Sequence, residues 1–256
     1  MKDDSRQHMR KNGGLLERPE KTALLWLARQ TPAWINSDHL TMIGLAAMLV
    51  AGAAYWAAAR YRFALIIVVV SLAVNWLGDS LDGTLARFRD CQRPRYGYYV
   101  DHVIDLFGVS VLLAGLACSG FMNCLITVSL LAAFALVEAE VFLATYVQRI
   151  FRLSCFRVGP TELRIVLAIG TLYLLYNPWV HIGHRRLLLF DVGGIISIAG
   201  LICAFVYSSL RNSRALYLAE PLKAHRPSCG DKSPDPFDRS STHIRRTALE
   251  SHSHGN

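Results

Sequence analysis

Two pairs of aspartates with helical spacing lie in the first half of the chain. Asp79 and Asp82 are three residues apart, and Asp101 and Asp105 are four residues apart. Residues at these spacings share one face of an α-helix. The connection between the two motifs has nine residues, which allows the two helices to run antiparallel with their acidic faces opposed. We therefore expect the four carboxylates to converge on one site.

The charge of this cluster predicts its chemistry. All four aspartates lie beside or within apolar segments, where an ionised group without a partner is costly. Two divalent cations, Mg²⁺ or Mn²⁺, would balance the four negative charges, and Mg²⁺ is commonly held by a few carboxylates together with substrate phosphates. The cluster therefore predicts a metal-dependent site for a diphosphate. Asp105, the last of the set, is the predicted base that takes a proton from an attacking hydroxyl.

Small residues and one arginine accompany the aspartates. Gly83, Ala86 and Gly97 lie where bulky side chains would block a ligand that approaches the helix backbone. Arg87 offers a planar, permanently charged fork for a phosphate or a base edge. In the alternative interpretation, the aspartates only pair with nearby arginines that set membrane topology. That alternative explains neither the helical spacing nor the small residues.

The elements that position this cluster are predicted to be membrane-spanning helices. The chain has 256 residues, of which 53% are hydrophobic and 18% charged; ordinary soluble domains have roughly 45–50% and about 25%. Six cysteines are scattered without a C-x-x-C pair, which indicates neither a disulfide framework nor a zinc site. Six segments have the length and apolarity of spans: 40–59, 63–87, 97–119, 122–147, 160–178 and 190–210.

These segments predict an all-α integral membrane protein with six transmembrane helices and three regions. Residues 1–38 form an N-terminal segment in which Glu20–Arg29 is an amphipathic helix lying in the membrane interface, ended by Pro32. Residues 39–210 form the membrane domain. Residues 211–256 are a basic tail, rich in Pro, Ser and His, that we expect to be disordered.

The basic residues predict the orientation in the membrane. Of 27 Lys and Arg, 22 lie on the side of the termini and four on the opposite side, with Arg164 inside the fifth predicted span. Both termini and the aspartates are therefore expected to be cytoplasmic. Since the basic residues flank spans, they favour contact with membrane lipids over nucleic acid.

The complete pattern resembles the signature of the CDP-alcohol phosphatidyltransferase family. The gap of nine residues falls within that family's usual eight or nine. A weaker resemblance extends over the six spans, the N-terminal helix and Asn36–Thr41. The residues that carry the signature are Asp79-x-x-Asp82-Gly83-x-x-Ala86-Arg87, nine residues, and Gly97-x-x-x-Asp101-x-x-x-Asp105.

The resemblance implies a membrane enzyme of phospholipid biosynthesis that displaces CMP from a CDP-linked donor and joins a phosphoryl group to an acceptor hydroxyl. It implies that Asp79, Asp82 and Asp101 bind the divalent metals and that Asp105 both contributes to the metal site and acts as the base. It also implies that the cytidine diphosphate of the donor is surrounded by Gly83, Ala86, Arg87 and Gly97.

The same resemblance implies a homodimer in a membrane of bacterial type, the inner membrane. CDP-diacylglycerol is the predicted donor, because compact members with six spans commonly use it. The alternative within the family is transfer from CDP-ethanolamine or CDP-choline to diacylglycerol. The acceptor alcohol stays open at this point.

Three polar features lie near the predicted site. The segment Gly159–Arg164 opens the fifth predicted span and either supports the acceptor site or only caps a helix. Glu138 and Glu140 are two apart in the fourth span and cannot both face the same way, so at least one needs a partner. His102 is predicted to face away from the aspartates.

Two other functions also use intramembrane acids. An intramembrane prenyltransferase has a first motif that Asn75-x-x-x-Asp79-x-x-Asp82 resembles, but its second acidic motif lies far downstream, whereas here Asp101 follows Asp82 by 19 residues. A cation transporter would have acids distributed along several spans near the membrane midplane. The acids of this chain instead gather at the ends of two neighbouring spans.

Overall fold

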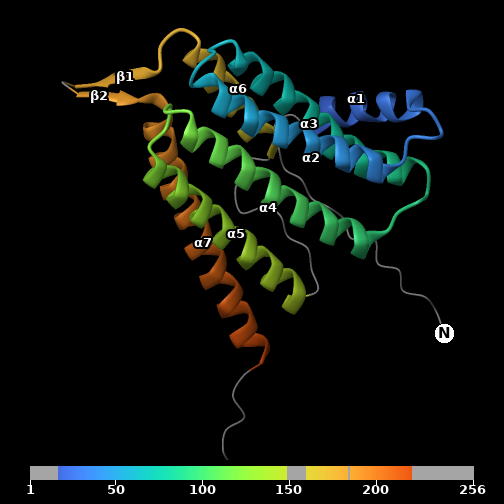
Figure 1. Cartoon of the computed structure of the whole chain (residues 1–256). Coiled ribbons are helices and arrows are strands. Elements are labelled where there is room, and N and C mark those ends of the chain that lie inside the picture. The colour runs from blue at the N-terminus through green and yellow to red at the C-terminus, as the bar shows by residue number, and fades with distance from the viewer. Residues whose placement is uncertain (1–16, 149–159, 184, 221–256) are drawn as a thin grey trace, which may run out of the picture. The chain divides into compact units, whose positions relative to one another are not determined.

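A computed structural model describes residues 17–148, 160–183 and 185–220 (Figure 1). Contacts divide the chain into residues 1–215 and 216–256, and the packing described below belongs to the first unit. Its helices and one hairpin follow in the order α1 (Glu17–Gln30), α2 (Ser37–Ala58), α3 (Ala64–Phe88), α4 (Pro94–Cys118), α5 (Cys124–Gln148), α6 (Pro160–Leu174), β1 (Trp179–Ile182), β2 (Arg185–Leu188) and α7 (Leu189–Ala219).

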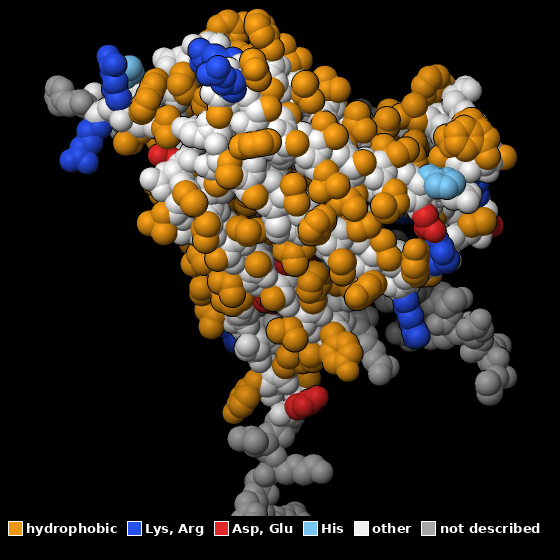
Figure 2. Space-filling view, in the orientation of Figure 1, with side chains coloured by type: hydrophobic (Ala, Val, Ile, Leu, Met, Phe, Trp, Pro, Cys, Tyr) orange, Lys and Arg blue, Asp and Glu red, His pale blue; other side chains and the backbone are white. Residues whose placement is uncertain are grey.

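Five of these helices, namely α2, α3, α4, α5 and α7, are long and apolar enough to cross a membrane. Their surfaces suit a lipid environment, since Figure 2 shows hydrophobic side chains over most of the face in view, and exposed apolar residues occur along all five. The prediction of an integral membrane protein built from helices is therefore supported. A helix is present near the N-terminus as α1, and its predicted place in the membrane interface stays a prediction.

The predicted count of six spans is not confirmed. The segment 160–178, predicted as the fifth span, forms α6 of only 15 residues, which is about 22 Å long and shorter than the roughly 30 Å of a hydrocarbon core. Pro178 disfavours helical geometry at Asn177, so the helix cannot continue into the segment that follows. The Asn177 side chain accepts a hydrogen bond from the Trp179 N–H (3.0 Å) at the start of the hairpin.

The hairpin and the end of α7 also differ from the predictions. Strands β1 and β2 pair antiparallel, with Trp179 opposite Leu188, in a stretch that the sequence pattern left between two spans. Helix α7 continues to Ala219, nine residues beyond the predicted span and into the predicted tail. Residues 221–256 of that tail, the segment 1–16 and residues 149–159 lie outside the described residues.

Helix α2 packs closely against both α3 and α4. Glycines allow the close approach. A Cβ on Gly52 of α2 would lie 2.5 Å from the carbonyl oxygen of Val111 in α4, and one on Gly115 would overlap the Gly52 carbonyl. A Cβ on Gly78 of α3 would lie 2.7 Å from the Leu40 carbonyl oxygen. Small residues at helix crossings are the usual means of tight packing within membranes.

Two clusters of buried apolar side chains pack the helices together. The larger one joins α2, α3, α4 and α6 and contains a buried hydrogen bond between Tyr55 Oη and Thr171 Oγ1 (2.6 Å). The smaller one seats Leu24 and Ala28 of α1 against Leu81 and Leu85 of α3. Helix α1 is therefore packed on α3 through its apolar face.

The connection that joins α3 to α4 begins with a tight helix end. Asp90 adopts a left-handed conformation (φ 56°), and the Cys91 N–H donates to the Ala86 carbonyl oxygen (3.0 Å). This is the Schellman arrangement, which ends a helix by reversing the chain direction. Pro94 then starts α4 at its first turn, where a missing N–H costs nothing. The connection stays short, and the two acidic motifs face each other.

Candidate active site

Three of the four predicted metal ligands come together between α3 and α4. Asp79 lies in the second half of α3, and Asp101 and Asp105 lie in the first half of α4. Each of these three residues offers a carboxylate oxygen, and the three oxygens lie within 4.8 Å of one another. Clustered carboxylate oxygens are the donors that hard divalent cations prefer, so the residues present fit a metal site.

Asp82 lines the same pocket, where its own oxygens are held by neighbours. Its Oδ2 accepts a hydrogen bond from Thr41 Oγ1 of α2 (2.6 Å), and its Oδ1 accepts one from the Gly83 N–H. The complete lining of the pocket is Thr41, Gly44, Leu45, Asn75, Asp79, Asp82, Asp101, Ile104 and Asp105. All four aspartates therefore border one pocket formed by α2, α3 and α4.

Arg164 of α6 reaches this site from a distant part of the sequence. Its Nη2 lies 2.8 Å from Asp79 Oδ2, and the two side chains are 18% and 25% exposed. An ion pair this far buried is screened less than a surface pair. The prediction that the segment ending at Arg164 supports the active site agrees with this contact. Gly159 of that segment lies outside the described residues.

Glu20 of α1 links α3 and α6 beside the site by hydrogen bonds. Its Oε1 accepts hydrogen bonds from Trp76 Nε1 (3.1 Å), Ser80 Oγ (3.3 Å) and Thr161 Oγ1 (3.2 Å). Trp76 and Ser80 flank Asp79 on α3, and Thr161 opens α6. Sequence reasoning did not predict this role, because Thr161 is 141 residues away from Glu20 and no local pattern links them.

The four residues predicted to contact the donor lie around the end of α3 and the start of α4. Arg87 lies over Gly83, since a Cβ on Gly83 would be 3.4 Å from the Arg87 Nη1 atom, and Arg87 also donates to Thr84 Oγ1 (3.2 Å). Gly97 is exposed, and a Cβ placed on it would meet nothing within 4 Å among the described residues. Ala86 lines a second, larger pocket.

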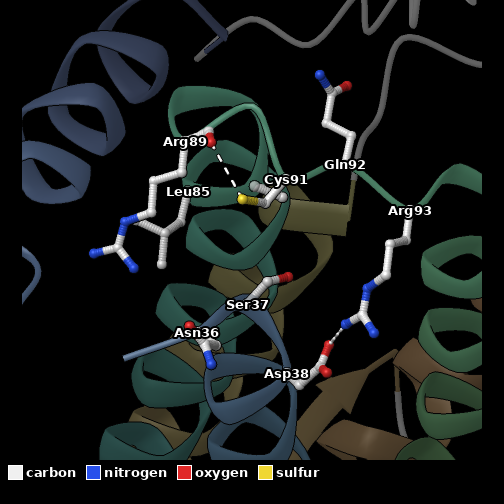
Figure 3. A pocket seen from close by; sticks show the side chains of 9 residues that line it. Asn36, Ser37, Asp38, Leu85, Arg89, Cys91, Gln92 and Arg93 are labelled. Atoms are coloured by element: carbon white, nitrogen blue, oxygen red, sulfur yellow. Dashed lines mark hydrogen bonds and ion pairs between the residues drawn. The ribbon is translucent and has the colours of Figure 1, made fainter. Parts of the chain in front are cut away.

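This larger pocket has a volume of about 500 Å³ (Figure 3). It lies between the start of α2, the end of α3 and the connection that follows. Its lining residues are Asn36, Ser37, Asp38, Leu85, Ala86, Arg89, Cys91, Gln92 and Arg93. Arg93 donates a hydrogen bond to Asp38 across the pocket (Figure 3), and this bond raises the pKa of the guanidinium.

Arg89 shapes one wall of the larger pocket through backbone contacts. Its guanidinium donates to the carbonyl oxygens of Thr31 (2.9 Å), Pro32 (2.9 Å) and Ile35 (2.6 Å), with a longer contact to Ala33 (3.5 Å). These carbonyls belong to the turn between α1 and α2. Sequence reasoning counted Arg89 only as one of the topology-setting charges, because the carbonyls that it binds carry no signal in the sequence.

Two further predictions about polar residues agree with the contacts. The His102 ring lies against Tyr98 (ring centroids 4.3 Å apart) and Phe142 of α5 (5.2 Å), which turns it toward α5. Glu140 accepts hydrogen bonds from Ser208 (2.9 Å) and Asn212 (2.6 Å) of α7. At least one of the paired glutamates therefore has the packing partner that their spacing requires.

Comparison with known protein families and proteins gives one match and one negative result. Residues 34–206 match the family model described as CDP-alcohol phosphatidyltransferase. The match runs from the turn before α2 into α7 and contains all four aspartates and all four predicted donor contacts. No curated protein matches the chain.

Proposed function

The chain belongs to the CDP-alcohol phosphatidyltransferase family, whose members transfer substituted phosphate groups, and on that premise we propose that its donor is CDP-diacylglycerol. The reaction would transfer the phosphatidyl group to an acceptor hydroxyl in phospholipid biosynthesis, with release of CMP. The observation that carries the proposal is the convergence of Asp79, Asp101 and Asp105 within 4.8 Å beside the guanidinium of Arg164.

We assign the metal site to the four aspartates, Asp79, Asp82, Asp101 and Asp105. Two divalent cations, Mg²⁺ or Mn²⁺, bound there would neutralise charge on the diphosphate and on the departing CMP. The fit rests on the chemistry of the donor set, because carboxylates lining a pocket of spanning helices need a positive charge. Arg164 supplies only one such charge.

The donor headgroup is assigned to Gly83, Ala86, Arg87 and Gly97. The open space at Gly97 and the larger pocket beside Ala86 give room for a nucleotide next to the acidic pocket. Arg87 follows Ala86 on α3, and its guanidinium is of the kind that donates paired hydrogen bonds to a phosphate. The recognition of cytidine itself rests on the family.

Asp105 is the proposed base. The acceptor oxygen attacks the phosphorus that carries the diacylglycerol, the proton of the acceptor hydroxyl passes to the Asp105 carboxylate, and the bond from that phosphorus to the oxygen of CMP breaks. Asp105 lies one helical turn beyond Asp101 on α4 and borders the same pocket as Asp79. From this position the Asp105 carboxylate could take the proton of an acceptor hydroxyl that is bound near the metal ligands.

The acceptor side is assigned to the start of α6. Thr161 and Arg164 lie three residues apart on α6; Thr161 donates a hydrogen bond to Glu20 of α1, and Arg164 is paired with Asp79 of α3. Arg164 would hold an anionic group of the acceptor or the donor. We also propose, from the distribution of Lys and Arg, that both termini and the site are cytoplasmic, and, from the family resemblance, that the protein is a homodimer in a bacterial inner membrane.

The decisive experiment measures CMP release by the purified full-length protein. It is supplied with CDP-diacylglycerol, Mg²⁺ or Mn²⁺ and a panel of hydroxyl acceptors that includes glycerol 3-phosphate, inositol, inositol phosphate and serine. We expect metal-dependent release with one acceptor, abolished by a chelator and in Asp101→Asn. Release only from CDP-ethanolamine or CDP-choline with diacylglycerol would replace the proposed donor by the alternative. Metal-dependent ion flux without any CMP release would favour a cation transporter.

A further inference from the structure

Asn75 is a buried polar residue that the donor, metal and base assignments leave unused. It lies on α3 one helical turn before Asp79 and is 4% exposed. Its Nδ2 donates a hydrogen bond to the Gly44 carbonyl oxygen of α2 (3.1 Å). This bond fixes the amide orientation. In the reverse orientation Oδ1 would face the Gly44 carbonyl oxygen, and two acceptors cannot form a hydrogen bond.

The other end of the same amide has no hydrogen-bond partner among the described residues. Asn75 Oδ1 is buried and unpaired, although buried polar atoms nearly always have a partner. Asn75 also lines the pocket that the four aspartates border. An acceptor atom left open in an otherwise well-packed helix pair is evidence for a ligand that supplies the missing contact.

The charges around Asn75 indicate which kind of ligand its Oδ1 would bind. The pocket is lined by four carboxylates, and the guanidinium of Arg164 is paired with one of them, Asp79. An amide oxygen in this setting can accept from a cation or from a bound water, and it adds a ligand without adding negative charge. Mg²⁺ and Mn²⁺ take oxygen ligands of this kind. Each ion is surrounded by six ligands, so two ions need more oxygen ligands than the four carboxylates alone provide.

We propose that Asn75 is a positioning residue of the divalent metal site, with its Oδ1 bound to the metal or to a water that the metal holds. The proposal rests on the proposed metal-dependent function and adds a neutral fifth residue to the four aspartates. It predicts that the free protein binds Mn²⁺ through Asn75 even when no lipid substrate is present.

The test is a Mn²⁺ titration of the purified full-length protein without substrate, with free Mn²⁺ measured by electron paramagnetic resonance. Asn75→Leu keeps the branched shape of the side chain but removes its oxygen and nitrogen, and we expect Mn²⁺ affinity to fall about tenfold or more. Ser71→Ala is the matched control, since Ser71 is a buried polar residue of α3 that does not line the pocket. Its Mn²⁺ affinity should stay within twofold of wild type.

Asn75→Asp separates the role of the oxygen from the role of the N–H. It keeps an oxygen but cannot donate to the Gly44 carbonyl, so it should bind Mn²⁺ at least as tightly as wild type. The proposal is overturned if folded Asn75→Leu binds Mn²⁺ like wild type, or if Asn75→Asp loses affinity as Asn75→Leu does. A wild type that binds no Mn²⁺, like Asp101→Asn, would overturn the metal site together with the role of Asn75.

Discussion

Replacement of Arg89 by methionine is expected to loosen the turn between α1 and α2. The guanidinium donates three hydrogen bonds of 2.9 Å or shorter to the carbonyl oxygens of Thr31, Pro32 and Ile35. Hydrogen bonds from a charged donor contribute roughly 1.5–3 kcal/mol each, and the partial exposure of Arg89 lowers this toward about 1 kcal/mol. The three together stabilise the turn by about 2–3 kcal/mol.

Hydrogen exchange measures this local stability directly. The Ile35 N–H donates to the Pro32 carbonyl (3.1 Å) and the His39 N–H to the Asn36 carbonyl (3.1 Å), so both amides report opening of the turn. A loss of about 2–3 kcal/mol should speed their exchange by about 30- to 160-fold in Arg89→Met. Because Asn36 and Asp38 line the larger pocket, the KM for the donor should rise as well.

Arg95→Met is the matched control for this experiment. Arg95 is an exposed basic residue in the first turn of α4, close in sequence to Arg89. Its replacement removes the same charge but should leave exchange at the turn unchanged. Exchange in Arg89→Met within threefold of wild type would refute the reasoning, and so would an equal acceleration in Arg95→Met, which would trace the effect to net charge.

Three other substitutions test the site and the packing. Asp105→Asn should reduce CMP release at least 1000-fold while Mn²⁺-dependent binding of the CDP-lipid is largely kept, as measured by equilibrium binding and single-turnover assays. Arg87→Ala should weaken donor binding about tenfold, corresponding to about 1.4 kcal/mol, as measured by the KM for CDP-diacylglycerol. Gly115→Val should prevent stable folding, because even a Cβ at this position overlaps the Gly52 carbonyl, and size-exclusion chromatography would report the loss.

Each of these expectations has a result that contradicts it. Full turnover in Asp105→Asn would remove this residue as the base. An unchanged KM in Arg87→Ala would break the assigned donor contact. A Gly115→Val protein with wild-type elution and melting would show that α2 and α4 do not cross as closely as described, with Gly193→Val of α7 as the control at an open glycine.

The acidic site was largely predictable because its information is local. Helical spacing sets which side chains share a face, and a short connection sets which faces meet, so the approach of Asp79 to Asp101 and Asp105 follows from two motifs and nine residues. The family match over residues 34–206 agrees with the same pattern. Asp82 was predicted with the other aspartates, but its hydrogen bond to Thr41 was not, since Thr41 lies on a different helix.

The lengths of the elements near the hairpin were less predictable. Apolarity alone did not separate the 15-residue helix α6 from a full span, because Leu175 and Tyr176 continue the apolar composition after the helix has ended. The composition after residue 210 also led to a prediction of a disordered tail where α7 continues for about two more turns. Residues 211–219 include three charged or amide residues, but Ala215, Leu216 and Leu218 are helix formers, and the helix continues through them.

Glu20 gives α1 a role that its amphipathic sequence does not reveal. Its Oε1 binds both Ser80, the neighbour of Asp79, and Thr161, which precedes Arg164 by three residues. Helices α3 and α6 are therefore joined twice, through Glu20 and through the ion pair of Asp79 with Arg164. If Asp79 binds a metal ion as proposed, its ion pair with Arg164 would weaken, and the hydrogen bonds to Glu20 would still hold α6 against α3. Helix α1 thus acts as a support for the arginine of the site as well as a segment packed on α3.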